Sequence, residues 1–149
     1  MTKNYRIPKF KVSAVKERSC IIPEHRIISK KDIEGISHFI LEDIGIEKIL
    51  IFALDGNNKI IGIKEEMGDT NQCIVYPKQV FTFLFSVSAS SFIISHNHPG
   101  GNTNPSKMDW DLTKKLQRIG KDLNLTLLDH IIVTEQECIS LREFSKWVN

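Results

Sequence analysis

The feature that most constrains the fold is an apolar run over residues 47–54, followed at once by the turn sequence Asp55-Gly56-Asn57-Asn58. The run is rich in β-branched and aromatic residues, which favours a buried strand. A second strand-like run over residues 59–65 follows the turn, so the pair predicts a β-hairpin. A sheet that combines an antiparallel hairpin with strands joined through helices must be mixed.

Strands that alternate with helices are predicted for the rest of the chain. Ser29 and Asp32 have the chemistry of a helix start, and apolar residues then recur at helical spacing as far as Ile44. Pro77 suits the first position of a second helix, and Ser106 precedes a third. The remaining expected elements are strands near 9–18, 74–76, 91–96 and 125–133 and a closing helix over 141–148. The sum is an α/β sandwich, a mixed β-sheet with flanking helices.

The N-terminal part differs from the rest in charge. Residues 1–31 contain nine Lys or Arg against two Glu, while the whole chain has a formal net charge of +2. We therefore divide the chain into a basic N-terminal arm, 1–28, and a domain, 29–149. Such an arm can make weak contacts with nucleic-acid phosphates. The alternation in Lys9-Phe10-Lys11-Val12 is better explained by the solvated face of an edge strand.

Composition is that of an ordinary globular domain. The chain has 149 residues, of which 41% are hydrophobic and 26% charged, enough for one continuous core. No apolar export segment follows Met1, and apolar runs such as 49–54 are too short to cross a bilayer, so we expect a cytoplasmic protein without membrane contact. Cys20, Cys73 and Cys138 are odd in number and far apart, which predicts reduced thiols without a disulfide framework.

Residues 95–109 carry the chemistry. His96 and His98 leave a predicted strand in an extended segment, so their imidazoles point to the same side. Asp109 lies in the first turn of the next helix, and a Pro- and Gly-rich turn can fold it back over the histidines. Two nitrogen ligands and one oxygen ligand predict a single catalytic zinc ion with an open position, where water has a pKa of about 7. The alternative, a solvated turn without metal, is disfavoured by the full H-x-H-x7-S-x2-D spacing.

A catalytic zinc ion needs a general base, and Glu47 is the candidate because it opens a predicted central strand. From Glu47 alone, the stronger explanation is that it is the last solvated residue of the preceding loop. Two other metal chemistries do not fit. The letters His96-Asn97-His98 are not the HNH nuclease signature, whose residues are spread over a hairpin and a helix. Zinc deaminases require H-x-E with P-C-x-x-C, and the chain has neither.

Three motif segments stand in order along the chain. They are His96-Asn97-His98-Pro99-Gly100-Gly101, Pro105-Ser106-Lys107-Met108-Asp109 and Leu127-Leu128-Asp129-His130-Ile131-Ile132-Val133. Weaker matches are Leu54-Asp55, Gly68 with Thr70-Asn71, and Tyr76-Pro77-Lys78. Together they closely resemble the RadC-like branch of the JAB/MPN+ (JAMM) zinc metallopeptidases, over about residues 45–144. The resemblance implies the MPN (JAB, cytidine-deaminase-like) α/β sandwich.

The resemblance also implies residue roles. His96, His98 and Asp109 match the family's zinc ligands, Ser106 matches its motif serine and Glu47 its catalytic glutamate. In that chemistry the glutamate takes a proton from zinc-bound water, the hydroxide attacks a carbonyl, and the serine hydroxyl stabilises the oxyanion. Ser106 can cap its helix as well, and the two roles are compatible.

Two further residues of the motifs, Asp129 and His130, are expected to support the ligands through hydrogen bonds rather than to bind metal. A polar pair that closes a strand is the alternative. The chain departs from the family at Gly100, where a serine is usual, and a short basic arm replaces the helix-hairpin-helix region that often precedes the RadC domain. The second of these departures weakens an inference of DNA binding.

The predicted function is therefore a zinc-dependent hydrolase of the metallopeptidase or isopeptidase type, acting on a peptide or protein substrate that the sequence does not identify. The alternative is a DNA-associated RadC-type accessory protein, with the family's DNA-repair label, in which the metal domain is a binding module and the basic arm contacts phosphates.

Overall fold

The computed structural model describes residues 8–19, 21–22, 26–41, 45–67 and 75–148. Its sheet contains the strands β1 (Lys48–Leu54), β2 (Ile60–Met67), β3 (Ser91–Asn97), β4 (Thr126–Val133) and β5 (Cys138–Ser140). Their order is β2-β1-β3-β4-β5, with β3 and β4 parallel and the other neighbouring pairs antiparallel. The predicted hairpin, now β1 and β2, and the predicted mixed sheet are confirmed.

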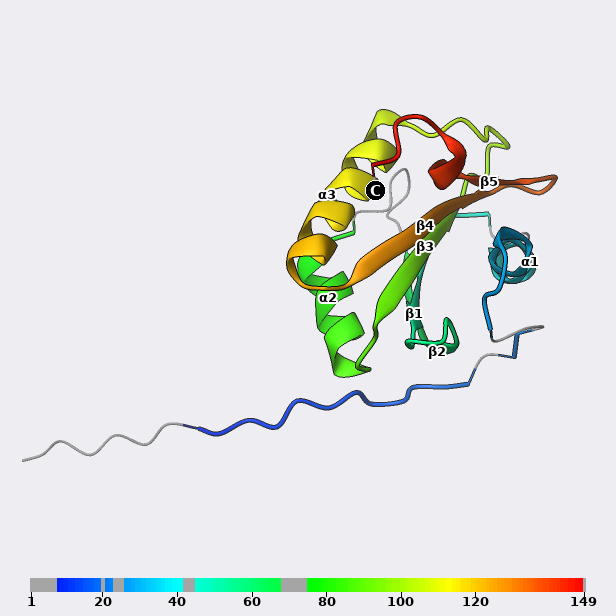
Figure 1. Ribbon diagram of the computed structural model, residues 1–149. Helices are drawn as coiled ribbons and strands as arrows, with labels where there is room; N and C mark the ends of the chain where they lie inside the picture. The colour runs from blue at the N-terminus through cyan, green and yellow to red at the C-terminus, as the bar shows by residue number, and fades with distance from the viewer. Residues whose placement is uncertain (1–7, 20, 23–25, 42–44, 68–74, 149) are drawn as a thin grey trace, which may run out of the picture.

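Helices cover both faces of this sheet, as Figure 1 shows. Helix α1 (Lys30–Leu41) packs on one face, over a buried cluster that includes Phe52 and Ile93. Helices α2 (Pro77–Ser86) and α3 (Lys107–Asp122) cover the other face, over a cluster that includes Ile51 and Ile94. Successive side chains of a strand point to opposite faces, which is why Ile93 and Ile94 enter different clusters. The α/β sandwich expected from the sequence is confirmed.

Local chemistry fixes where α1 and α3 begin, and a glycine near the end of α3 lies close to β4. At the start of α1 the Asp32 carboxylate accepts a hydrogen bond from the Ser29 backbone N–H at 2.7 Å. Helix α3 begins after Ser106, which is its N-cap. Near the end of α3 a Cβ atom on Gly120 would lie 2.2 Å from the carbonyl oxygen of Leu125. Glycine therefore allows the close approach of α3 to the residue that precedes β4.

The N-terminal arm differs from its prediction. Residues 8–19 contain no helix or strand, and Phe10 and Val15 are 86% and 89% exposed, so the strand predicted near 9–18 is wrong. The alternating pattern that predicted it requires a neighbouring strand. The arm contacts the sheet through the ion pair of Arg18 with Glu65 of β2 at 3.4 Å, and Figure 1 shows it continuing past the domain from there. Nearer the domain, Arg26 and Lys59 form an isolated antiparallel bridge.

The C-terminal segment also differs. The helix predicted over 141–148 is reduced to a 3-10 turn, Leu141–Glu143. Phe144 then packs edge-on against Trp110 of α3, with ring centroids 5.8 Å apart, so the chain end covers α3 instead of continuing as a helix. The strand β5 was not predicted, because three residues are too few for a periodic pattern.

The strand predicted at 74–76 is not seen at Val75 and Tyr76, which carry no regular structure. Several predicted features lie outside the described residues: the helical position Ile44, the strand residue Ile74, the turn at 68–71, and the thiols of Cys20 and Cys73. Within the described ranges, none of the helices combines the length and apolar character that crossing a lipid bilayer requires.

Candidate metal centre

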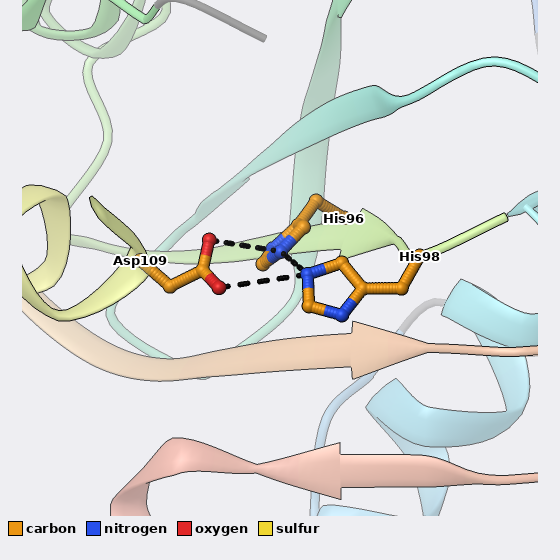
Figure 2. A group of neighbouring side chains, drawn as sticks. All are labelled: His96, His98 and Asp109. Atoms are coloured by element: carbon orange, nitrogen blue, oxygen red, sulfur yellow. Dashed lines mark hydrogen bonds and ion pairs between the residues drawn. The ribbon is translucent and has the colours of Figure 1, made fainter. Parts of the chain in front are cut away.

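Three side chains converge where β3 ends beside the start of α3, as Figure 2 shows. His96 lies in β3 and is fully buried, His98 follows the last residue of that strand, and Asp109 is in the first turn of α3. His96 Nε2 lies 2.8 Å from His98 Nε2 and 3.1 Å from Asp109 Oδ1, while His98 Nε2 lies 3.5 Å from Asp109 Oδ2. One ligand atom from each residue lies within 4.8 Å of the others, so the group could bind a metal ion.

A chain of hydrogen bonds determines which nitrogen of His96 is free. The Thr113 hydroxyl contacts the Asp109 carbonyl oxygen at 2.6 Å, and a carbonyl only accepts, so Thr113 donates its single hydrogen there. Thr113 Oγ1 must then accept from His130 Nδ1, also at 2.6 Å, which leaves His130 Nε2 as an acceptor. His96 Nδ1 donates to that atom at 2.7 Å. The unprotonated nitrogen of His96 is therefore Nε2, which faces His98 and Asp109.

His98 has the same orientation for a different reason. Its Nδ1 lies 2.5 Å from the Asn102 carbonyl oxygen and must donate to it, so its Nε2 also carries a lone pair in the neutral ring. Its backbone N–H donates to the Val133 carbonyl oxygen at 2.8 Å, which attaches the segment after β3 to the end of β4. Both Nε2 lone pairs thus point into one space beside a carboxylate, and such a set of acceptors fits a cation.

Asp109 is held by the helix that carries it. Ser106 and Asp109 form a capping box: the Ser106 N–H donates to Asp109 Oδ2 at 2.7 Å, and the Asp109 N–H donates to Ser106 Oγ at 3.1 Å. The N-terminus of α3 adds the partial positive charge of its unpaired backbone N–H groups, which favours the ionised carboxylate. The carboxylate is therefore fixed in position before any metal arrives.

The electrostatics of the site favour added positive charge. Once protonated at Nε2, His98 donates a hydrogen bond to Asp109, and this bond raises the pKa of His98 against the effect of its burial. Burial alone would raise the pKa of Asp109, but the hydrogen bonds that His96 and His98 donate to its carboxylate when they are protonated hold that pKa well below its usual range. Burial, with the nearby His96, keeps the pKa of His130 well below that of a free histidine, so His130 stays neutral. A proton or a divalent cation would be attracted to the same place, between His98 and Asp109.

The candidate catalytic residues lie beside this group. Glu47 is half-buried, immediately precedes β1, and its charge contributes to raising the pKa of His98. Two residues further along, Ile49 pairs with His96 in the antiparallel register of β1 and β3. Ser106 Oγ accepts the capping bond, and accepting it does not use the hydroxyl hydrogen. The fold thus brings Glu47 and Ser106 to the end of the sheet where the histidines lie.

Asp129 and His130, the two polar residues of the third motif, have different surroundings. His130 contacts His96, whereas the Asp129 carboxylate faces β5 and accepts from Ser140 Oγ at 2.7 and 2.9 Å and from the backbone N–H of Arg142 at 3.3 Å. Burial raises the pKa of Asp129 despite these hydrogen bonds. Among the hydrogen bonds of the described residues, none joins Asp129 to His96, His98 or Asp109.

Sequence reasoning missed two residues that orient the histidine rings of this group: Thr113, which acts through His130, and Asn102, which acts directly. Thr113 lies four residues after Asp109, one helical turn further along the same face of α3, and this spacing is the signal that could have identified it. Asn102 acts through its backbone carbonyl, so its residue type carries no signal.

The fold and the site together define an α/β domain in which two histidines and an aspartate, a group that could bind a metal ion, lie at one end of a mixed sheet. The family model described as RadC-like JAB domain matches residues 27–147, and the chain belongs to this family. The family resemblance drawn from the motifs is thereby confirmed.

Curated relatives agree with this assignment. A UPF0758 protein of Pelobacter propionicus is 36% identical over 119 residues, covering 79% of this chain and 52% of the relative. One from Clostridium perfringens is 40% identical over 98 residues, covering 65% of this chain and 43% of the relative, and one from Methanosarcina barkeri is 36% identical over 124 residues, covering 81% and 53%. The chain thus spans about half the length of these relatives. Their names state no activity.

Proposed function

We propose that this chain is a zinc-dependent hydrolase of the metallopeptidase or isopeptidase type, which cleaves an amide bond in a peptide or protein. The observation that carries the proposal is the convergence of His96 Nε2, His98 Nε2 and the Asp109 carboxylate, with both ring tautomers fixed by hydrogen bonds. The side chains of His98 and Asp109 are 18% and 11% exposed, so solvent reaches the group while His96 stays buried.

The donor set supports zinc as the metal. Imidazole nitrogen with carboxylate oxygen suits zinc, and three protein ligands are typical of catalytic sites, whereas structural zinc sites use four. When bound, zinc supplies a Lewis acid and lowers the pKa of water to about 7. The residues of this chain that would hold it are His96, His98 and Asp109.

Glu47 and Ser106 have the remaining roles in the proposed reaction. The Glu47 carboxylate takes a proton from the attacking water and later returns it to the leaving amine. The Ser106 hydroxyl donates a hydrogen bond to the oxygen that becomes negatively charged when the carbonyl is attacked. Its Oγ meanwhile accepts from the Asp109 N–H, which holds that hydroxyl at the start of α3.

The test is metal-dependent cleavage. We would measure bound zinc by mass spectrometry, remove it with a chelator, and assay the metal-free and reconstituted protein against a library of peptides and isopeptides. The proposal expects one zinc per chain and cleavage that zinc restores. Cleavage that persists unchanged without metal would contradict it.

The second candidate, a DNA-associated accessory protein, is supported by the exposed basic residues of the arm, among them Lys9, Lys11 and Lys16. Neutralised phosphates release counterions, so such binding must weaken steeply with added salt. DNA affinity that falls with salt and is unchanged by Glu47→Gln, in a protein without cleavage activity, would favour this candidate.

A further inference from the structure

The side chain of Asn97 joins the metal-ligand segment to the neighbouring strand. Asn97 stands between His96 and His98 in sequence and is 3% exposed. Its Oδ1 accepts from the Lys48 backbone N–H at 2.7 Å, and its Nδ2 donates to the Ile46 carbonyl oxygen at 2.9 Å. These two backbone groups belong to the two peptide bonds on either side of Glu47. We call this pair of contacts the Asn97 bridge.

The geometry of the Asn97 bridge continues the sheet beyond its last backbone pair. The antiparallel register of β1 and β3 ends at Ile49 opposite His96. A side-chain amide carries one acceptor and donors in a plane, as a peptide group does, so Asn97 replaces the missing ladder bonds at the next position. Both peptide planes that flank Glu47 are then fixed. Because those planes define φ and ψ of Glu47, the direction of its Cα–Cβ bond is fixed too.

We propose that Asn97 is a positioning residue, which sets the place of the Glu47 carboxylate relative to His96 and His98. The consequence for turnover rests on the proposed hydrolase function, but the restraint on the Glu47 backbone does not. A general base must lie within hydrogen-bond reach of the proton that it takes, and a misplacement of about 1 Å can cost about 100-fold in rate. A bridge between the two segments keeps that separation constant.

The metal ligands do not depend on the Asn97 bridge. His96 is oriented by His130, and His98 is held by the carbonyl oxygens of Asn102 and Val133. Removing the Asn97 amide should therefore release the Glu47 segment and leave metal binding intact. This separation allows a positioning role to be distinguished from a role in ligation.

The residue type is specific to the task. Aspartate has the same size and can accept from Lys48, but as a carboxylate it cannot donate to the Ile46 carbonyl. Alanine removes both contacts. A matched control exists at the other end of β1, where Asp55 Oδ1 accepts from the backbone N–H groups of Asn57 and Lys59 at 2.8 and 3.0 Å. Asp55→Ala removes a comparable strand-end contact away from the metal centre.

The experiment compares Asn97→Ala, Asn97→Asp and Asp55→Ala by amide hydrogen exchange and by zinc content. We expect the Lys48 amide to exchange roughly five- to tenfold faster in Asn97→Ala, as loss of one hydrogen bond implies, with unchanged exchange in Asp55→Ala and one zinc retained in all three. In Asn97→Asp the Lys48 amide stays protected, while the Ile46 carbonyl 13C resonance shifts. This variant also carries the test if Asn97→Ala does not fold. Unchanged Lys48 exchange in Asn97→Ala, or an unshifted Ile46 carbonyl in Asn97→Asp, would overturn the bridge.

Turnover provides the second readout. If Asn97 acts through Glu47, then Asn97→Ala lowers kcat in the wild-type background but adds little in the Glu47→Gln background, because the two residues act as one unit. Additive losses would overturn the positioning role. If no variant or wild-type protein cleaves any amide while the exchange results hold, the hydrolase proposal fails and the bridge stands.

Discussion

The rings of His96 and His130 are joined at 2.7 Å, Nδ1 to Nε2, although 34 residues separate them in the chain. The hydrogen bond of Thr113 fixes the proton position on His130, and His130 in turn fixes the proton position on His96. The contact between His96 and His130 comes from the parallel pairing of β3 and β4, in which Ile94 lies opposite His130. A buried neutral histidine outside the His96, His98 and Asp109 group thus determines which nitrogen of His96 faces His98 and Asp109.

The ligand assignment predicts the effect of single alanine substitutions. His96→Ala, His98→Ala and Asp109→Ala should each lower the zinc content sharply, because a site reduced to two ligands loses most of its affinity. The domain buries its own core, so each variant should remain folded. Zinc content by mass spectrometry, with circular dichroism on the same samples, checks this. Stoichiometric zinc in all three variants would show that the site is elsewhere.

A second prediction concerns Thr113. Thr113→Val keeps the shape of the side chain but removes the hydroxyl, so His130 Nδ1 loses its acceptor and the tautomer of His96 is no longer fixed. We expect zinc affinity to fall about 10- to 100-fold, the usual effect of losing a hydrogen-bond partner behind a ligand. Thr126→Val, an exposed position on β4, is the matched control. Competition with a chelating dye measures the affinity, and equal values for the two variants would refute the role of Thr113.

The contacts behind these two predictions differ in how well they could be predicted from the sequence. The ligands and the Ser106 cap lie within 14 residues of one another in a local pattern, and strand and helix periodicity is enough to bring them together. The Thr113 contact with His130 depends on the register of β4 against β3 and on how α3 packs beside β4, close to which Gly120 lies. Neither the strand register nor the packing of the helix produces a periodic pattern in the sequence. The expected strand near 9–18 failed for the related reason that alternation indicates a strand only where a partner is present.

Asp129 should affect stability rather than metal binding. Asp129→Ala leaves the Ser140 hydroxyl and the backbone N–H groups of His130 and Arg142 without their acceptor, and we expect a loss of about 2 kcal/mol in the free energy of unfolding. Asp129→Asn keeps an acceptor oxygen and removes a carboxyl whose pKa is raised by burial, so it should cost much less. Urea denaturation measures both, with zinc content as the companion assay. Loss of zinc in a folded Asp129→Asn variant would assign this residue to the metal centre after all.

Cys138 gives a prediction about pH. Burial raises the pKa of its thiol to about 11, and its Sγ donates to the Glu34 carbonyl oxygen at 3.6 Å. The folded state therefore favours the protonated thiol, so this group lowers the free energy of unfolding as the pH rises from 9.0 towards about 11. At pH 8 only roughly one thiol in a thousand is ionised, and iodoacetamide should label Cys138 slowly until urea unfolds the chain. Rapid labelling in native buffer, resolved by peptide mass spectrometry, would contradict the burial.

The most diagnostic change is Glu47→Gln, because it separates metal binding from catalysis. Gln has nearly the shape of Glu but cannot take the proton, and Glu47 is not among the three residues of the metal group, so zinc should stay bound. A positioned general base contributes about 10²- to 10⁴-fold, and a loss near the top of that range is expected because Glu47 would also orient the water in the proposed reaction.

Ser106→Ala should cost less, about 10²- to 10³-fold, as for one oxyanion donor, with an additional small loss of stability from the missing cap of α3. Steady-state kinetics on zinc-loaded variants, with melting temperatures, ranks the two. Cap loss alone would lower the melting temperature without lowering kcat at a temperature where the variant is folded, so the two contributions of Ser106 separate. If Glu47→Gln kept near-normal turnover while Ser106→Ala did not, Glu47 would be only the residue before β1, and the proton would have to go to another group at the end of the sheet.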